Sequence, residues 1–144
     1  MRRADQLAKF RTVGQTVSPE RAIVLLYERM GRDLAQARIA IANGDTEARH
    51  NALVHAQEIV AELAYAVRPD LWDGADRLLS IYDYLLNLLV RANVESNVPA
   101  IDEAAALVAK LTAAWQEAYV EVAAETLAAD QPTPQPAPTE HLTA

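Results

Sequence analysis

Apolar residues recur at alternating spacings of four and three along four stretches of the chain, a pattern typical of helices that bury one face. The first stretch follows Ser18-Pro19, in which Ser caps a helix and Pro takes its first position, and it ends at Asn43-Gly44. Its apolar positions are Ile23, Tyr27, Met30, Leu34, Ala37 and Ile41. This spacing predicts a helix whose single seam faces a bundle.

Three further stretches repeat the pattern. The second begins after Asp45, which suits a helix cap, and stops at Arg68-Pro69. The third runs from about Asp73 to Asn93, and the fourth follows the turn at 96–99. Their seams are Leu53, Ala56, Val60, Leu63 and Val67; Leu78, Tyr82, Leu85, Leu89 and Ala92; and Ile101, Ala104, Val108, Leu111, Trp115, Ala118 and Val122.

Short connections between long helices force neighbouring helices to run antiparallel. We therefore predict an all-α fold, an antiparallel up-down four-helix bundle over residues 18–129, with helices of about 20 to 28 residues. Residues 1–17 show no sustained period and are expected to form an irregular N-terminal segment. Residues 130–144 are rich in Pro and cannot bury apolar area, so a disordered tail is expected there.

The third stretch has a wider apolar arc than one seam requires. Ile81, Tyr84 and Leu88 add a second stripe, so the arc exceeds about 200° at 100° per residue. Packing by two neighbouring helices explains much of this width, but surplus apolar surface also indicates a partner or a further element lying over it. We expect these three side chains to be only partly buried until a segment fills a groove. Leu26 and Tyr27 should border the same groove if the first and third helices are adjacent.

Composition narrows the kind of partner. The net charge of −7 argues against nucleic acid and against an anionic membrane surface, because both need clustered positive charge. Cysteine is absent, which excludes a disulfide scaffold and suits a reducing cytoplasm. No apolar run approaches the roughly 20 residues of a membrane span, and no apolar stretch follows Arg2-Arg3 as a secretion signal would require. A cytosolic protein without stable membrane insertion is expected.

The sequence contains few residues in patterns typical of metal-binding or catalytic sites. Glu47-Ala-Arg-His50 matches a di-iron ligand motif, but that site needs the motif on two helices and a Glu from each of the others. His55 and Glu58 have the spacing in the reverse order, and no phosphate loop or nucleophile motif occurs. We expect no metal, no cofactor and no catalytic residue, and hence no enzyme. Two other functions stay open: a structural bundle that self-associates through its apolar stripe, and a metal-binding bundle enzyme.

Four elements in order resemble the flagellar secretion chaperone family, FliS. They are "SPERAIVLLYERM", "ARIAIANGDTEARHNALVHAQEIVAELAYAV", "LLSIYDYLLNLLVRAN" and the late Trp115. The family pattern has a Ser/Thr-Pro helix start before Leu-Tyr, then Ala-x-x-Ile-x-x-Glu-Leu, then Tyr-Asp-Tyr with Leu and Ala-Asn downstream. It is matched at Ala56, Ile59, Glu62, Leu63, Tyr82, Asp83, Tyr84, Leu89, Ala92 and Asn93. The ordered set covers roughly residues 10 to 120 and is more specific than any one piece.

The resemblance implies a chaperone that holds the disordered C-terminal part of flagellin in the cytoplasm, prevents premature polymerisation and presents flagellin to the type III export gate. The candidate groove residues are Leu26, Tyr27, Ile81, Tyr84, Leu85, Leu88, Ala92 and Asn93. The resemblance also implies that the N-terminal segment caps this groove, with Phe10, Val13 and Val17 as the candidate contacts. The family usually carries Tyr in that segment, where this chain has Phe10. The Pro-rich tail is not part of the family pattern.

Overall fold

The structure is a computed structural model that describes residues 18–68, 70 and 73–130, with side chains as far as residue 118. Four helices make up its regular structure: α2 (Pro19–Ala42), α3 (Thr46–Ala66), α4 (Ala75–Glu95) and α5 (Val98–Asp130). No strand occurs among the described residues, and the predicted all-α class is confirmed. The predicted N-terminal segment and the tail beyond Asp130 lie outside the described residues.

Local chemistry begins and ends the helices where the sequence predicts. The Ser18 hydroxyl accepts a hydrogen bond from the backbone N–H of Arg21 at 3.1 Å, which satisfies a free donor in the first turn of α2. Asp45 caps α3 in the same way, accepting from the N–H of Ala48 at 3.0 Å. Gly44 separates the two helices with a φ of 69°, a left-handed conformation that suits glycine.

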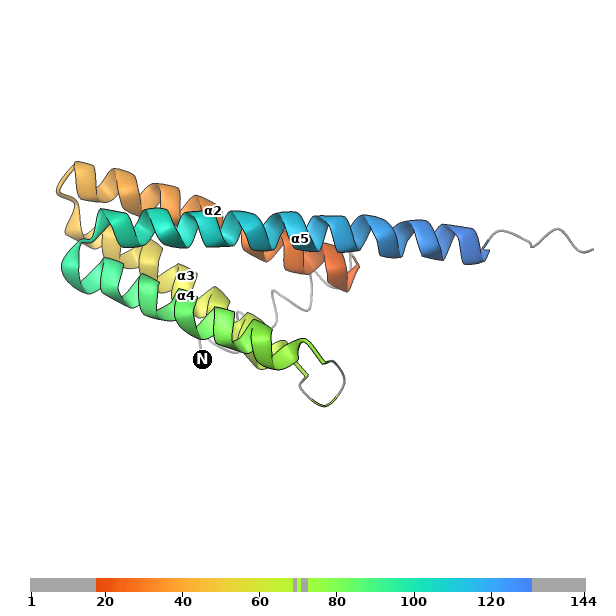
Figure 1. Ribbon diagram of the computed structural model, residues 1–144. Helices are drawn as coiled ribbons and strands as arrows, with labels where there is room; N and C mark the ends of the chain where they lie inside the picture. The colour runs from red at the N-terminus through yellow and green to blue at the C-terminus, as the bar shows by residue number, and fades with distance from the viewer. Residues whose placement is uncertain (1–17, 69, 71–72, 131–144) are drawn as a thin grey trace, which may run out of the picture.

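Helix α5 is longer than predicted. It spans 33 residues, whereas the sequence pattern indicates helices of about 20 to 28. Its interior contains neither Gly nor a further Pro after Pro99, and the next Pro is Pro132. Ala, Leu, Glu and Gln are frequent in this stretch, and these residues favour helix. In Figure 1 the C-terminal part of α5 accordingly extends past the start of α2.

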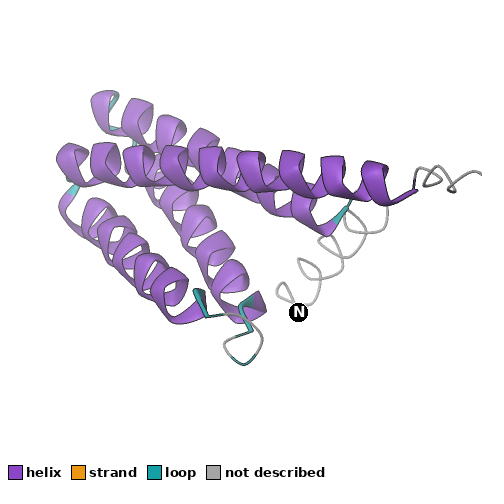
Figure 2. Ribbon diagram, turned by 45° about the vertical axis from the view of Figure 1, so that its right-hand side comes forward, coloured by secondary structure: helices purple, strands orange, loops and turns teal. Residues whose placement is uncertain are grey.

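The helices pack in the cyclic order α2–α3–α4–α5, and α5 returns to α2. Each helix contacts two others, while α2 and α4 face each other diagonally, which confirms the up-down bundle. Figures 1 and 2 show that the α2/α5 pair and the α3/α4 pair lie close together at the turns 43–45 and 96–97. The pairs diverge towards the other end, where α2 and α4 begin. We call these the closed end and the open end.

The predicted seams supply most of the core. All five seam residues of α4 are buried, and the seams of α2 and α3 are buried except at their outermost positions. In α5 the seam is buried from Ile101 to Leu111, and Trp115 is partly buried at the open end. Burial on this scale is what stabilises helices that would be marginal alone.

Two buried tyrosines join the diagonal helices on the open-end side of the core. The hydroxyls of Tyr27 on α2 and Tyr82 on α4 form a hydrogen bond of 2.5 Å, and both side chains are buried. Burial raises the pKa of both phenols, so both stay neutral at physiological pH and each can donate or accept. The bond therefore links two helices that are otherwise not neighbours.

Breaking this bond on one side should be more costly than removing it altogether. Tyr27→Phe leaves the Tyr82 hydroxyl without its partner in the core, and we expect it to lower the free energy of unfolding by about 1–3 kcal/mol. Adding Tyr82→Phe removes the unpartnered hydroxyl, so the loss of stability in the double variant should be smaller than the sum of the losses in the two single variants. Urea denaturation of the four proteins measures this coupling. Strictly additive losses would contradict it.

A charged side chain, Asp33, is buried within the described part of the bundle and was not anticipated from the sequence. Its carboxylate pairs with His55 Nδ1 on α3 at 2.5 Å and with Arg29 Nε at 3.4 Å. His55 therefore helps to hold α2 against α3. The sequence does contain a signal, because Asp33 continues a stripe of 3 and 4 spacing between Met30 and Ala37.

Asp33 should make stability fall as the pH rises. Burial raises the pKa of its carboxyl, and the partners His55 and Arg29 offset this only in part. At pH values between about 3.9, the ordinary pKa of Asp, and the raised pKa, the folded chain holds a proton on Asp33 that the unfolded chain has released. The stabilisation present at low pH is therefore lost as the pH rises through the raised pKa. Asp33→Asn cannot ionise, so its stability relative to the native chain should increase from pH 3 to pH 7 in urea titrations. A pH-independent difference would contradict this.

Candidate functional site

A groove between α4 and α5 is the candidate partner-binding site. It is a hollow of about 420 Å³ whose lining residues are Arg77, Ser80, Ile81, Tyr84, Glu103, Ala106, Leu107 and Lys110. Ile81 and Leu107 are partly buried against the core and form the apolar part of this α4/α5 groove. Tyr84 is half-exposed beside them. The groove thus presents apolar surface from two helices, with charged side chains around it.

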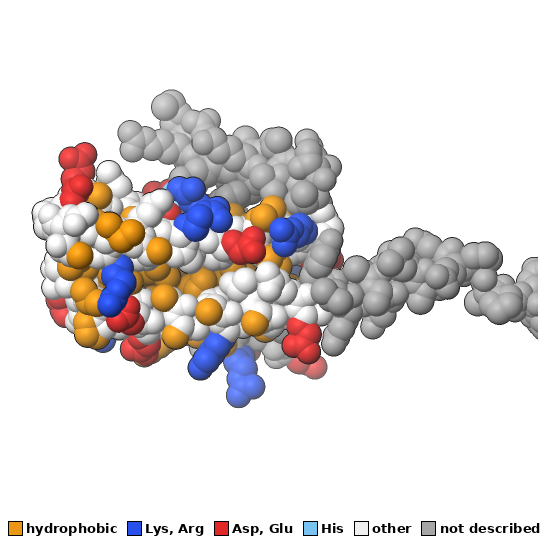
Figure 3. All heavy atoms as spheres, turned by 90° about the horizontal axis from the view of Figure 1, so that it is seen from above, with side chains coloured by type: hydrophobic (Ala, Val, Ile, Leu, Met, Phe, Trp, Pro, Cys, Tyr) orange, Lys and Arg blue, Asp and Glu red, His pale blue; other side chains and the backbone are white. Residues whose placement is uncertain are grey.

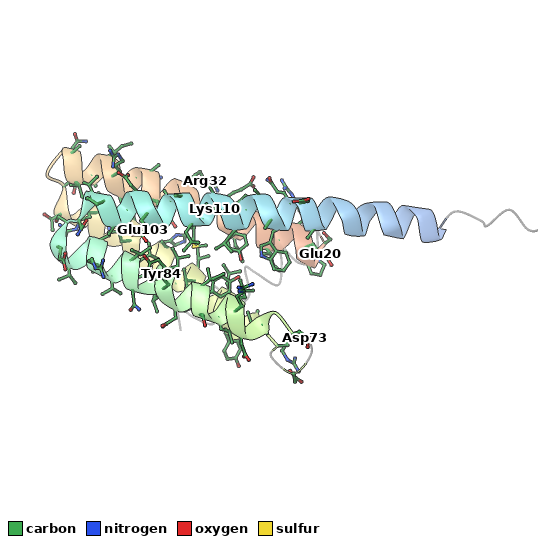
Figure 4. The ribbon with its side chains drawn as sticks, in the orientation of Figure 1. Glu20, Arg32, Asp73, Tyr84, Glu103 and Lys110 are labelled. Atoms are coloured by element: carbon green, nitrogen blue, oxygen red, sulfur yellow. The ribbon has the colours of Figure 1, made fainter. Side chains whose placement is uncertain are left out.

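The position of Ile81 and Tyr84 follows from the seam of α4. Ile81 lies three positions after the buried seam residue Leu78 and so at the edge of that stripe, and Tyr84, three positions after Ile81, lies one step further round the helix from the core. Tyr84 donates a hydrogen bond to the carboxylate of Glu103, and this bond raises the pKa of the phenol. Figure 4 shows Tyr84 and Glu103 facing each other from α4 and α5. The bond joins the two sides of the groove near the closed end.

Three other predicted groove residues belong to the core. Leu85, Leu88 and Ala92 are all buried, and Leu88 is only 1% exposed. The expectation that Leu88 stays partly exposed without a partner is therefore wrong. Leu88 belongs to the buried core cluster, and α4 packs against both α3 and α5, so packing by two neighbouring helices is enough to explain why this residue is apolar.

The first helix does not border the α4/α5 groove. Leu26 and Tyr27 were expected there if the first and third helices were adjacent, but α2 and α4 are diagonal. Tyr27 is buried and Leu26 is partly buried against the core. An up-down connection places consecutive helices side by side, which is why the first and third cannot be neighbours. The candidate cap residues, Phe10, Val13 and Val17, lie outside the described residues.

Asn93 lies in a polar network at the closed end. Its Oδ1 accepts a hydrogen bond from Arg49 Nε at 3.2 Å, and its Nδ2 is 3.0 Å from His50 Nδ1. Arg49 also donates to Ser96 Oγ at 2.7 Å. These contacts tie the start of α3 to the end of α4. The structure thus places Asn93 away from the α4/α5 groove and gives it a role in joining helices.

Two further hollows lie on the bundle. One, of about 200 Å³ at the open end, is lined by Ile23, Leu63, Ala66, Val67, Arg68, Leu78, Tyr82 and Trp115. The other, of about 610 Å³, runs between α2 and α5 over small side chains such as Gly31 and Ala109. In Figure 3 hydrophobic side chains form a band along the described part of the bundle, with charged side chains on its flanks. The surplus apolar surface is therefore spread over several hollows, and the sequence did not indicate that Trp115 lines one.

The described side chains offer little for catalysis. None of them form a group of three or more His, Cys, Asp or Glu residues that could hold a metal ion. His50 bonds to Asn93, and His55 pairs with Asp33. Within the described ranges, no helix is both long and apolar enough to cross a membrane.

Comparison with known proteins bears on the identity of the chain. The family described as "Flagellar protein FliS" matches residues 2–122. The chain is similar to the flagellar secretion chaperone FliS of Bacillus subtilis, with 28% identity over 93 residues, 65% of this chain and 69% of that protein. It is also similar to the flagellar secretion chaperone FliS of Salmonella typhimurium, with 30% identity over 95 residues, 65% of this chain and 70% of that protein.

Proposed function

Since the chain belongs to the FliS family of flagellar proteins, we propose that it is a cytoplasmic export chaperone that binds the disordered C-terminal segment of flagellin. Binding keeps flagellin from polymerising before export and presents it to the flagellar type III secretion apparatus. The names of the two similar proteins support the chaperone role. The observation that supports the mode of binding is the apolar α4/α5 groove on the helical bundle.

The α4/α5 groove is proposed as one contact site for the flagellin segment. Ile81 and Leu107 offer apolar surface that a partner can cover, and Tyr84 offers a half-exposed ring. Leu85 and Leu88 support the groove from the core rather than contacting the partner. Because the bundle supplies a rigid surface, the entropy lost on binding falls mainly on the flagellin segment.

The energetics require more surface than this groove alone. Ordering a disordered segment costs about 1–2 kcal/mol per residue, while burial returns only about 25 cal/mol for each apolar Å². Coupled folding and binding therefore typically buries about 1,000 to 3,000 Å². The hollows between α2 and α5 and at the open end provide additional apolar surface on the same bundle. We infer that the flagellin segment contacts more than one of them.

Co-expression tests the proposed function. The chain and its cognate flagellin should migrate together in size-exclusion chromatography, and deletion of the C-terminal segment of flagellin should abolish the complex. Failure to form a complex with full-length flagellin would refute the proposal. A complex that survives the deletion would show that another part of flagellin is bound.

Self-association remains a second candidate because α4 exposes two valines one turn apart. Val90 is 43% exposed and Val94 is 79% exposed. A homodimer seam over them would bury both permanently, whereas a chaperone should be mostly monomeric and gain stability from flagellin. Light scattering of the purified chain across concentrations distinguishes the two states.

A further inference from the structure

The charges around the α4/α5 groove are separated along its length. Arg77 on α4 and Lys110 on α5 line it towards the open end, and Glu103 lines it towards the closed end. Glu103 and Lys110 are seven residues apart on one helix, which corresponds to about 10 Å at 1.5 Å per residue. Figure 4 shows them at separate positions along α5. The groove therefore has a negative end and a positive end, with apolar Ile81 and Leu107 between them.

The two ends differ in whether their charges already have partners. The Glu103 carboxylate accepts a hydrogen bond from Tyr84. Arg77 and Lys110 are both exposed, and among the described side chains no ion pair or hydrogen bond engages either of them. Two cations that have no partner among the described side chains therefore flank one apolar hollow, in a chain with a net charge of −7. Their placement suits an anionic group on whatever fills the groove.

We propose, building on the flagellin-binding function above, that the α4/α5 groove binds a helix of the flagellin segment in one direction. The N-terminal end of that helix lies beside Glu103, and its C-terminal end carries an acidic side chain between Arg77 and Lys110. Helix dipoles favour this direction, because the positive N-terminus faces a carboxylate and the free C-terminal carbonyls face two cations. The bound helix thus runs parallel to α5 and antiparallel to α4.

The proposed acidic side chain at the C-terminal end of the bound helix is stabilised by the two cations. A carboxylate in the last turn of a helix is disfavoured by the dipole of that helix, and Arg77 and Lys110 offset this. Exposed ion pairs are weak individually, so the apolar contacts supply most of the affinity and the charges choose direction and partner. This arrangement defines the partner as an amphipathic helix with an acid at its C-terminal end.

Charge reversal tests the proposal. Arg77→Glu with Lys110→Glu should weaken binding of the isolated C-terminal segment of cognate flagellin about tenfold at low ionic strength, and less at high salt. Arg21→Glu with Arg38→Glu lowers the net charge by the same amount at residues that do not line the groove, and should change affinity less than twofold. Isothermal titration measures both, and circular dichroism checks that both variants are folded. Equal affinities for the two double variants would overturn the proposal.

A charge swap tests the direction. Each acidic residue of the flagellin segment is changed to Lys in turn and titrated against the Arg77→Glu/Lys110→Glu variant. One Lys substitution should restore most of the lost affinity, and it should lie C-terminal to the apolar residues whose replacement by Ala weakens binding. No rescue, or rescue only from the N-terminal side, would overturn the direction. If unaltered flagellin binds tightly and no charge change alters its affinity, the chaperone function stands and this inference fails. If unaltered flagellin does not bind, the chaperone function and this inference both fail.

Discussion

The double substitution Ile81→Asp and Leu107→Asp is expected to weaken binding of the flagellin C-terminal segment at least about a hundredfold while the bundle stays folded. Both side chains are apolar, partly buried and on facing sides of the α4/α5 groove. Two carboxylates there must be desolvated when an apolar helix docks, which costs several kcal/mol. At about 1.4 kcal/mol per tenfold change, a hundredfold loss needs only about 2.8 kcal/mol. Calorimetric titration gives the affinity, and circular dichroism gives the helicity.

The matched control is Val90→Asp with Val94→Asp on α4. It adds the same two charges at positions that are more exposed and do not line the α4/α5 groove. Its affinity for flagellin should stay within about threefold of the native value, since no groove contact is altered. Undiminished binding by the Ile81/Leu107 variant with intact helicity would refute this groove as a binding site. Loss of helicity would show that the two residues are needed for the core.

Leu88→Ala is expected to lower the free energy of unfolding by about 2–5 kcal/mol. The side chain is 1% exposed in the centre of α4, so truncation removes buried contacts and leaves a cavity. A loss of this size is a large part of the total stability of a small domain. Chemical denaturation measures it directly. The flagellin affinity of the folded fraction should change little, because Leu88 does not line the α4/α5 groove.

Val94→Ala is the control for this prediction. The residue is six positions further along the same helix and is 79% exposed, so its truncation should change stability by no more than about 0.5 kcal/mol. Equal losses for the two variants would contradict the placement of Leu88 in the core. If Leu88→Ala instead keeps its stability and loses flagellin binding, Leu88 is a partner-binding residue after all.

The sequence by itself determined the four helices and most of their ends, although α5 is longer than predicted. Ser18, Asp45 and Gly44 act through their own side chains or backbone conformation, so local chemistry is sufficient to place these boundaries. The seams could be predicted too, because a 3.6-residue period assigns each residue an angle around its helix. Short turns then required an up-down order. The family could be identified from the same ordered motifs.

The tertiary structure decided which neighbour covers each side of a helix. Ile81 and Leu88 belong to the same stripe in the sequence, but Ile81 borders a groove and Leu88 is buried. Periodicity gives an angle around one helix axis and carries no information about where the adjacent helices lie. For the same reason the sequence could not show that Leu107, Arg77 and Lys110 share the α4/α5 groove, or that Asp33 meets His55. Those contacts join residues on different helices, and only the packing of the bundle brings them together.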